Sequence, residues 1–215
     1  MLFHAPSLAG TVKELFLVRH GEVEGAKPGM LLGRSDLPLS ETGRTQAERL
    51  RGLVPWGPGV KWLCSPLLRA RQTVEIAAAG QAVAVEILPD LREVDFGQWE
   101  GLTFSEVSRQ FPGEVEGWLS FAPEFAFPQG EPLEVFGNRI RQLADLLATC
   151  EEDTVVAFTH GGVIRGLICH FLGLELRSYL LFDVAPGAVA TLRVWENRGV
   201  LAGLYRPGEE RQAGA

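Results

Sequence analysis

Two of the four histidines in this 215-residue chain stand directly behind apolar runs that are typical of buried strands. His20 follows residues 15–18 after one arginine, and His160 follows residues 154–158 after one threonine. Apolar runs of this length indicate strands covered on both faces of a sheet, and open α/β sheets bind ligands at the carboxyl ends of their strands. Each histidine also precedes a glycine, which lets a ligand approach the backbone closely. The pattern makes both histidines candidates for one site.

Two arginines accompany these histidines. Arg19 directly precedes His20, and Arg69 falls in the first turn of a helix expected after a third apolar run, residues 60–64. The N–H groups of a first helical turn favour anions, and a guanidinium matches phosphate oxygens with its fork of donors. Because the chain carries a net charge of −7, an anionic ligand needs such a local positive cluster. Since a histidine can also attack phosphorus and hold the phosphoryl group, we expect a site for a phosphorylated substrate.

Other chemistries fit the sequence less well. A single histidine behind a strand is more often a hydrogen-bonded structural residue, but two in the same context, each with an arginine companion, favour a function. Cys64 precedes Arg69 by one residue fewer than a cysteine phosphatase loop requires, and we expect its side chain in the core. No glycine-rich loop with Lys-Ser/Thr is present, and the adjacent Cys169 and His170 have no familiar metal-ligand spacing. We therefore expect no metal.

The composition predicts a globular protein that acts on a small molecule in a reducing compartment. The three cysteines are odd in number and lie in apolar segments, which argues against a disulfide framework. No apolar run approaches the ~20 residues that span a bilayer, and the start of the chain does not resemble a signal peptide. The negative net charge disfavours nucleic acid. We expect a cytoplasmic protein with a small-molecule phosphomonoester as its partner, no nucleic acid and no membrane, and a homodimer stays open.

Strand-like and helix-like segments alternate along the chain, which predicts an α/β sandwich with a mostly parallel sheet. Ser65-Pro66 has the cap-then-proline pattern that begins a helix. We expect a single domain over residues 1–215, with loose termini at about 1–12 and 206–215. Strands are expected at residues 15–18, 60–64, 82–88, 154–158, 179–184 and 188–195, followed by a short return strand. Helices are expected at residues 40–54, 65–79, 103–111, within 112–130, at 131–147, and from after residue 162 to 171.

Several motifs resemble one protein family in their residues and their order. Leu17-Val18-Arg19-His20-Gly21-Glu22 is similar to the signature of the histidine phosphatase superfamily, also called phosphoglycerate mutase-like. Further matches, within residues 15–166, are Gly33-Arg34 with Asp36 to Ser40 and Gly43, Ser65 to Ala70 with Thr73, Leu91-Arg92-Glu93 with Phe96-Gly97 and Trp99-Glu100-Gly101, and Thr159-His160-Gly161-Gly162.

The resemblance implies a three-layer α/β/α sandwich and a phosphohistidine mechanism without metal or cofactor. His20 would be the nucleophile, and Glu93 would protonate the leaving oxygen and later act as the base for water. His160 would join the catalytic group. The phosphate pocket would consist of Arg19, His20, Arg69 and His160, with Gly33 and Gly161 as further substrate-binding candidates.

Within the family, two positions favour a phosphatase over a mutase. Mutases resemble this chain but carry serine or threonine where it has Val23, and asparagine where it has Ala26. The stretch from Phe96 to Gly101 resembles the phosphatase branch, which includes α-ribazole phosphatases and broad-specificity enzymes. The resemblance therefore implies a phosphomonoester phosphatase, with α-ribazole phosphate as one candidate substrate. A phosphoglycerate mutase and a catalytically silent relative that binds phosphorylated ligands are the alternatives.

Two features of the central region stay open at the level of sequence. Phe96 and Trp99 can shield Glu93 from water, while Asp95 and Glu100 are nearby alternatives that we expect to be structural or surface charges. An aromatic group can either line a specificity wall or form core, the more common outcome. Its members are Phe104, Trp118, Phe121, Phe125 and Phe127.

Overall fold

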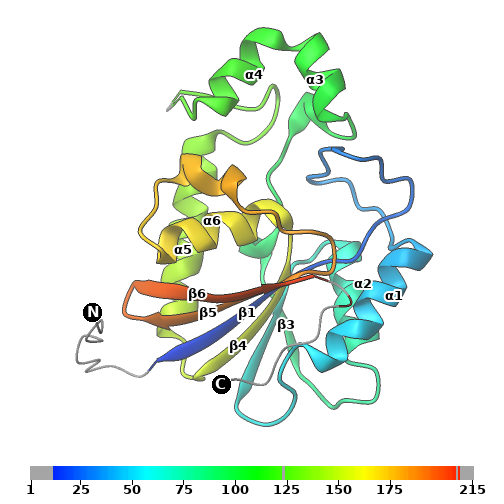
Figure 1. Ribbon diagram of the computed structural model, residues 1–215, viewed down its shortest axis with the longest axis vertical. Coiled ribbons are helices and arrows are strands. Elements are labelled where there is room, and N and C mark those ends of the chain that lie inside the picture. Colours follow the sequence, from blue (N-terminus) through cyan, green and yellow to red (C-terminus); the bar gives the residue numbers. More distant parts are fainter. Residues whose placement is uncertain (1–11, 123, 207, 209–215) are drawn as a thin grey trace.

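The computed structural model describes residues 12–122, 124–206 and 208, whose strands form one six-stranded sheet in the order β3-β2-β4-β1-β5-β6 (Figure 1). The neighbours from β3 to β1 pair in parallel, whereas β5 runs antiparallel to both β1 and β6. The predicted mostly parallel α/β architecture is confirmed. The strands are β1 (Lys13–Arg19), β2 (Val60–Cys64), β3 (Val85–Ile87), β4 (Thr154–Thr159), β5 (Val189–Trp195) and β6 (Arg198–Tyr205).

Helices cover both faces of the sheet and make three layers. Because successive strand residues point to opposite faces, Phe16 and Val18 of β1 join one apolar cluster, with α2 (Leu68–Ala77) and the 3-10 turn η1 (Leu50–Gly52). Leu15 and Leu17 join the other cluster, with α5 (Leu133–Thr149) and α6 (Gly161–Phe171). The helices are α1 (Glu41–Arg49), α2 (Leu68–Ala77), α3 (Phe104–Gln110), α4 (Pro112–Leu119), α5 (Leu133–Thr149) and α6 (Gly161–Phe171).

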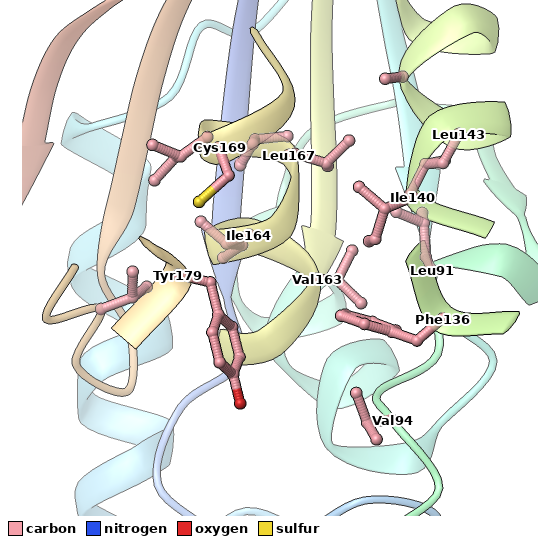
Figure 2. Packing of buried hydrophobic residues seen from close by; sticks show 14 of the residues in the cluster. Leu91, Val94, Phe136, Ile140, Leu143, Val163, Ile164, Leu167, Cys169 and Tyr179 are labelled. Atoms are coloured by element: carbon pink, nitrogen blue, oxygen red, sulfur yellow. The ribbon is translucent and has the colours of Figure 1, made fainter. Parts of the chain in front are cut away.

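Close packing of α5 on α6 fixes the helix that carries the second histidine motif (Figure 2). Ile140 of α5 lies so near Gly166 of α6 that a Cβ there would come within 2.9 Å of the Ile140 Cγ1 atom. Phe136, Ile140 and Leu143 form the buried stripe of α5 that the apolar spacing predicts. The amino-terminal end of α6, directly behind β4, is held in place by this contact.

Helices α3 and α4 lie at one end of the molecule, apart from the helices that cover the sheet (Figure 1). Thr103 and Glu106 begin α3 with a reciprocal capping box, and Pro112 stands in the first turn of α4. Trp99 is fully buried and packs between these helices and the body. Its ring partners are Phe111, Trp118, Phe125 and Phe127.

The prediction of a strand at residues 179–184 is wrong. Residues Leu176–Leu181 form a 3-10 helix, η4, in which Tyr179 is buried while Leu181 is 81% exposed. A short apolar run does not by itself distinguish a strand from a buried helical turn, and the β1 edge that a strand would need is occupied by β5. Pro186, which has no N–H for a ladder, follows before β5 begins.

The expected start of α2 and the expected length of β3 also need correction. Helix α2 begins at Leu68 rather than at Ser65-Pro66, because Asp36 of a distant loop accepts the Leu68 N–H at 2.5 Å. The strand expected at 82–88 covers only Val85–Ile87. The expected loose termini lie outside the described residues except for 12, 206 and 208. None of the described helices is long and apolar enough to cross a membrane.

Candidate active site

The carboxyl ends of β1 and β4 bring the two histidine motifs side by side. Arg19 and Thr159 are register partners in the parallel pair, so the residues that follow them meet at one edge of the sheet. The rings of His20 and His160 have their centroids 5.0 Å apart. Arg69 enters from α2 and donates its Nε–H to His20 Nε2 at 3.1 Å. The four cationic or imidazole side chains singled out in the sequence therefore converge.

His20 is held in one tautomer and is uncharged. Its Nδ1 lies 2.7 Å from the carbonyl oxygen of Gly21; since a carbonyl only accepts, Nδ1 carries the proton and Nε2 carries the lone pair. Burial, helped by Arg69 and Arg19, lowers the pKa of His20 well below its ordinary value. The turn depends on glycine, because a Cβ at Gly21 would lie 2.4 Å from the Gly43 oxygen. The imidazole is thus neutral at neutral pH, with its Nε2 unprotonated.

Arg69 is fully buried and its fork is anchored on backbone. It donates to the carbonyl oxygens of Ser35 and Gly33, each at 2.7 Å. Gly33 is therefore a support of Arg69 and does not line the cavity described below. The carboxylate of Glu100 in turn accepts hydrogen bonds from the backbone N–H groups of this loop, residues 33–35.

Arg19 presents unused donors to the same site. Its Nη1 donates to the Val184 carbonyl at 2.6 Å, but its buried Nε has no hydrogen-bond partner among the described residues. Burial lowers the pKa of Arg19 to about 10, with Glu93 opposing the shift and Arg165 adding to it. The guanidinium stays charged at neutral pH. Because buried donors are normally paired, this donor is available to an acceptor oxygen of a ligand.

His160 faces His20 from the start of α6. Its Nε2 lies 2.7 Å from the Ser65 hydroxyl oxygen, and its buried Nδ1 has no partner within the part of the chain that the structure describes. Burial, with Arg69 as the next cause, lowers its pKa well below the ordinary value. Gly161, the next residue, lines the cavity.

Glu93 reaches the site from the aperiodic stretch between β3 and α3. Its carboxylate oxygens accept the backbone N–H groups of Gly162 at 2.9 Å and Val94 at 3.0 Å. A Cβ at Gly162 would lie 2.5 Å from Glu93 Oε1, so the close approach requires glycine. Of the alternative carboxylates, Asp95 accepts the N–H of Gly97 and Glu100 holds the loop at residues 33–35. Neither lines the cavity, as expected for structural charges.

Arg19, His20 and Glu93 form the floor of a cavity of about 600 Å³, whereas Arg69 and His160, which adjoin His20, are fully buried and do not line it. Phe104, Trp118 and Tyr179 stand on its apolar side, and Trp118 donates its indole N–H to the Tyr179 hydroxyl at 3.1 Å. Of the aromatic group weighed in the sequence, Phe104 and Trp118 line the cavity, whereas Phe125 and Phe127 belong to the core. The other lining residues are Arg19, His20, Glu22, Val23, Ala26, Lys27, Pro28, Gly29, Met30, Leu31, Leu32, Glu93, Val94, Phe96, Gly161, Gly162, Arg165, Leu180, Asp183 and Pro186.

Arg165 and Tyr179 are among the lining residues that the sequence did not predict. Arg165 stands four residues after Gly161, on the same face of α6, and this spacing was a usable signal. Tyr179 was assigned to a strand and therefore overlooked. Cys64 is buried in the core as expected, and burial raises its pKa to about 12. Among the described residues, no group of three or more His, Cys, Asp or Glu is placed to hold a metal ion.

Comparisons with known proteins agree with this geometry. The model of one family, the histidine phosphatase superfamily (branch 1), matches residues 15–206. An adenosylcobalamin/alpha-ribazole phosphatase of Salmonella typhimurium is 31% identical, over 86% of this chain and 97% of that protein. Phosphoserine phosphatase 1 of Hydrogenobacter thermophilus is 30% identical, over 89% of this chain and 91% of its own length.

Solved structures show the same relationship. The crystal structure of a phosphoglycerate mutase from Thermus thermophilus superposes with a TM-score of 0.68 and 36% sequence identity. The match covers 88% of this chain and 99% of that one. Together with the match of the family model, these similarities show that the chain belongs to the histidine phosphatase superfamily, branch 1.

Proposed function

We propose that the protein hydrolyses a small phosphorylated metabolite through a phosphohistidine on His20. The observation that carries the proposal is the state of that imidazole: neutral, with Nδ1–H donated to the Gly21 carbonyl and the Nε2 lone pair directed toward Arg69. A purely structural role does not explain why His20 lies beside two guanidinium groups and a second histidine whose pKa is also lowered. A nucleophile needs an unprotonated nitrogen, which Nε2 supplies, and the cations would bind the phosphate oxygens.

The first half-reaction transfers the phosphoryl group to the enzyme. Nε2 of His20 forms a bond to phosphorus while the bond from phosphorus to the ester oxygen breaks. Glu93, in its acid form, gives its proton to that departing oxygen. Arg19, Arg69 and His160 stabilise the charge on the three remaining phosphate oxygens.

The second half-reaction returns the enzyme to its starting state. A water molecule attacks the phosphorus of the phosphohistidine, and Glu93, now a carboxylate, takes one of its protons. The bond between phosphorus and Nε2 breaks, inorganic phosphate leaves, and both His20 and the Glu93 acid are restored. Every proton and electron pair is accounted for by these two side chains and water.

The apolar side of the cavity favours a substrate with a flat aromatic group. Phe104, Trp118 and Tyr179 offer ring faces and edges next to the phosphate end, and such contacts favour an aromatic partner over a small polar one. Alpha-ribazole phosphate is the kind of substrate named for the Salmonella relative. We propose it as the substrate.

Hydrolysis is favoured over the mutase reaction by two residues of the wall. Val23 and Ala26 both line the cavity, and neither side chain can donate a hydrogen bond to a second phosphate group. A phosphoryl group on His20 would therefore pass to water. We propose metal-independent catalysis in the cytoplasm, on a small molecule rather than on nucleic acid, by a monomer or a homodimer.

A substrate panel tests the proposal directly. Alpha-ribazole 5′-phosphate, phosphoserine, 3-phosphoglycerate and nitrophenyl phosphate would be compared by kcat/KM, with and without a chelator. The proposal expects phosphate release that is unchanged by chelation and highest for alpha-ribazole phosphate. Efficient interconversion of 2- and 3-phosphoglycerate would place the protein among the mutases, and no turnover of any ester would make it a binding protein.

A further inference from the structure

Glu93 stands on a segment with almost no regular structure, yet it must hold a carboxyl group to within a fraction of an ångström for proton transfer. The segment consists of two single-turn 3-10 helices, η2 (Pro89–Leu91) and η3 (Gly97–Trp99), joined by extended residues. Hydrogen bonds from Val94 and Gly162 hold the carboxylate itself. They do not explain what fixes the backbone from which the side chain extends.

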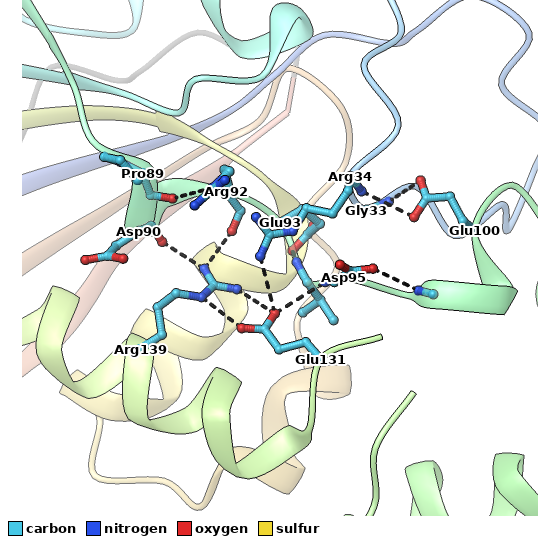
Figure 3. A network of polar contacts seen from close by, with 12 residues as sticks. Gly33, Arg34, Pro89, Asp90, Arg92, Glu93, Asp95, Glu100, Glu131 and Arg139 are labelled. Atoms are coloured by element: carbon cyan, nitrogen blue, oxygen red, sulfur yellow. Dashed lines mark hydrogen bonds and ion pairs between the residues drawn. The ribbon is translucent and has the colours of Figure 1, made fainter. Parts of the chain in front are cut away.

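The carbonyl groups just before Glu93 are held by Arg139, a residue of α5 that does not line the cavity (Figure 3). Arg139 Nη1 donates to the Asp90 carbonyl at 2.8 Å and to the Arg92 carbonyl at 2.7 Å. The carbonyl between them, that of Leu91, accepts the hydroxyl of Thr159 at 2.6 Å. Three successive peptide groups leading to Glu93 are therefore fixed from helix α5 and strand β4.

The far side of Glu93 is tied to the same guanidinium through Glu131 (Figure 3). Glu131 accepts Arg139 Nε at 3.1 Å and Nη2 at 2.9 Å in a two-bond pair, with both side chains nearly buried. Glu131 also accepts the backbone N–H of Asp95 at 3.3 Å and returns its own N–H to the Asp95 carbonyl at 2.9 Å. The Arg139–Glu131 ion pair therefore makes hydrogen bonds to the backbone at residues 90, 92 and 95.

We propose that Arg139 and Glu131 are positioning residues that aim Glu93 at the leaving oxygen. Neither one touches the substrate, so they act only through Glu93, and the inference rests on the proposed role of Glu93 as the proton donor. Without the guanidinium, two carbonyls lose their donors and the segment relaxes. A shift of about 1 Å in a catalytic group costs on the order of 10²-fold in rate.

The dependence on the leaving group separates positioning from a general structural role. Nitrophenolate departs without a proton, whereas an alkoxide needs one. Single-turnover phosphorylation of His20 would be measured with nitrophenyl phosphate and with an alkyl phosphate. Arg139→Met is expected to slow the alkyl ester by about 10²-fold and to leave the nitrophenyl ester nearly unchanged. Arg139→Lys, which keeps one charged donor, is expected to recover part of the loss. Arg141→Met, on the exposed side of the same helix, serves as the matched control and should change neither rate.

Two further variants keep the outcomes distinct. If Arg139→Met does not fold because the nearly buried Glu131 is left with only its 3.8 Å ion pair to Arg34, the double variant Glu131→Gln with Arg139→Met removes that charge and is measured instead. Loss confined to the alkyl ester supports the inference. The inference is overturned if Glu93→Gln slows only the alkyl ester but the Arg139 variant slows both esters equally or slows neither. If Glu93→Gln itself shows no selectivity, the proposed role of Glu93 fails, and the inference fails with it.

Discussion

The two ends of the cavity are built in different ways. At the phosphate end, the side chains of Arg69 and His160 are fully buried and that of His20 is 5% exposed; they follow strands of the sheet or begin helices packed on it. At the outer end, Phe104 and Leu180 are 42% and 45% exposed and come from α3 and η4, outside the layers. We infer that the sheet supplies the chemistry, whereas the attached elements select the substrate.

The largest expected effect comes from a cation at the phosphate end. Arg19→Met removes the charge and the free Nε donor, and we expect kcat/KM to fall by about 10³-fold for every ester, as when a donor to transition-state charge is lost. Arg193→Met, an exposed arginine of β5, is the control. A loss that differed strongly between esters would show that Arg19 contacts the alcohol part of the substrate rather than its phosphate group.

A methyl group at Gly162 tests the contact between α6 and Glu93, the proposed proton donor. Gly162→Ala would bring a Cβ to 2.5 Å from Glu93 Oε1, and we expect a loss of about 10²-fold for alkyl esters with little effect on nitrophenyl phosphate. In Gly166→Ala, one turn further along α6, the Cβ would meet Ile140 instead. That variant should lose stability without any change in leaving-group selectivity, and a selective loss there would refute the explanation.

Changes at the outer end should reorder substrates instead of abolishing turnover. Phe104→Ala is expected to raise KM for alpha-ribazole phosphate by about tenfold, the value of one aromatic contact and its burial, and to leave kcat for phosphoserine unchanged. Leu119→Ala, an exposed position in α4 that does not line the cavity, is the control. An equal fall in kcat for both substrates would contradict the division between the two ends.

The same division explains how far the sequence could predict the structure. The phosphate end was predictable because apolar runs report buried strands, and the ends of parallel strands meet at one edge: His20 and His160 follow directly from this rule. The outer end depends on contacts between distant segments. Tyr179 was misassigned because its burial comes from Phe121 and Trp118, which are distant in the sequence. Arg139 gave no signal, because two of its partners are backbone carbonyls, which any residue can supply, and its side-chain partner Glu131 lies eight residues away along the chain.

The smallest effect concerns stability and pH. The pKa values of His20 and His160 lie well below 6.5 in the folded protein, so between those values and 6.5 the unfolded chain binds more protons. Stability should therefore fall as the pH drops below 6.5, by up to about 1.4 kcal/mol per pH unit for each histidine. Denaturant unfolding at pH 7 and pH 5 checks this, and His160→Gln should flatten the dependence. A slope as steep as that of the unmodified protein would contradict the burial argument.

The central claim is that the phosphoryl group passes through His20, and trapping it is the most direct measurement. Labelled substrate would be mixed rapidly with the protein, quenched in base because phosphohistidine is acid-labile, and the label located by peptide mass spectrometry. We predict phosphate on the His20 imidazole, formed and consumed at rates that match turnover, and absent from His20→Ala. Label on another side chain, or full turnover by His20→Ala, would contradict the account.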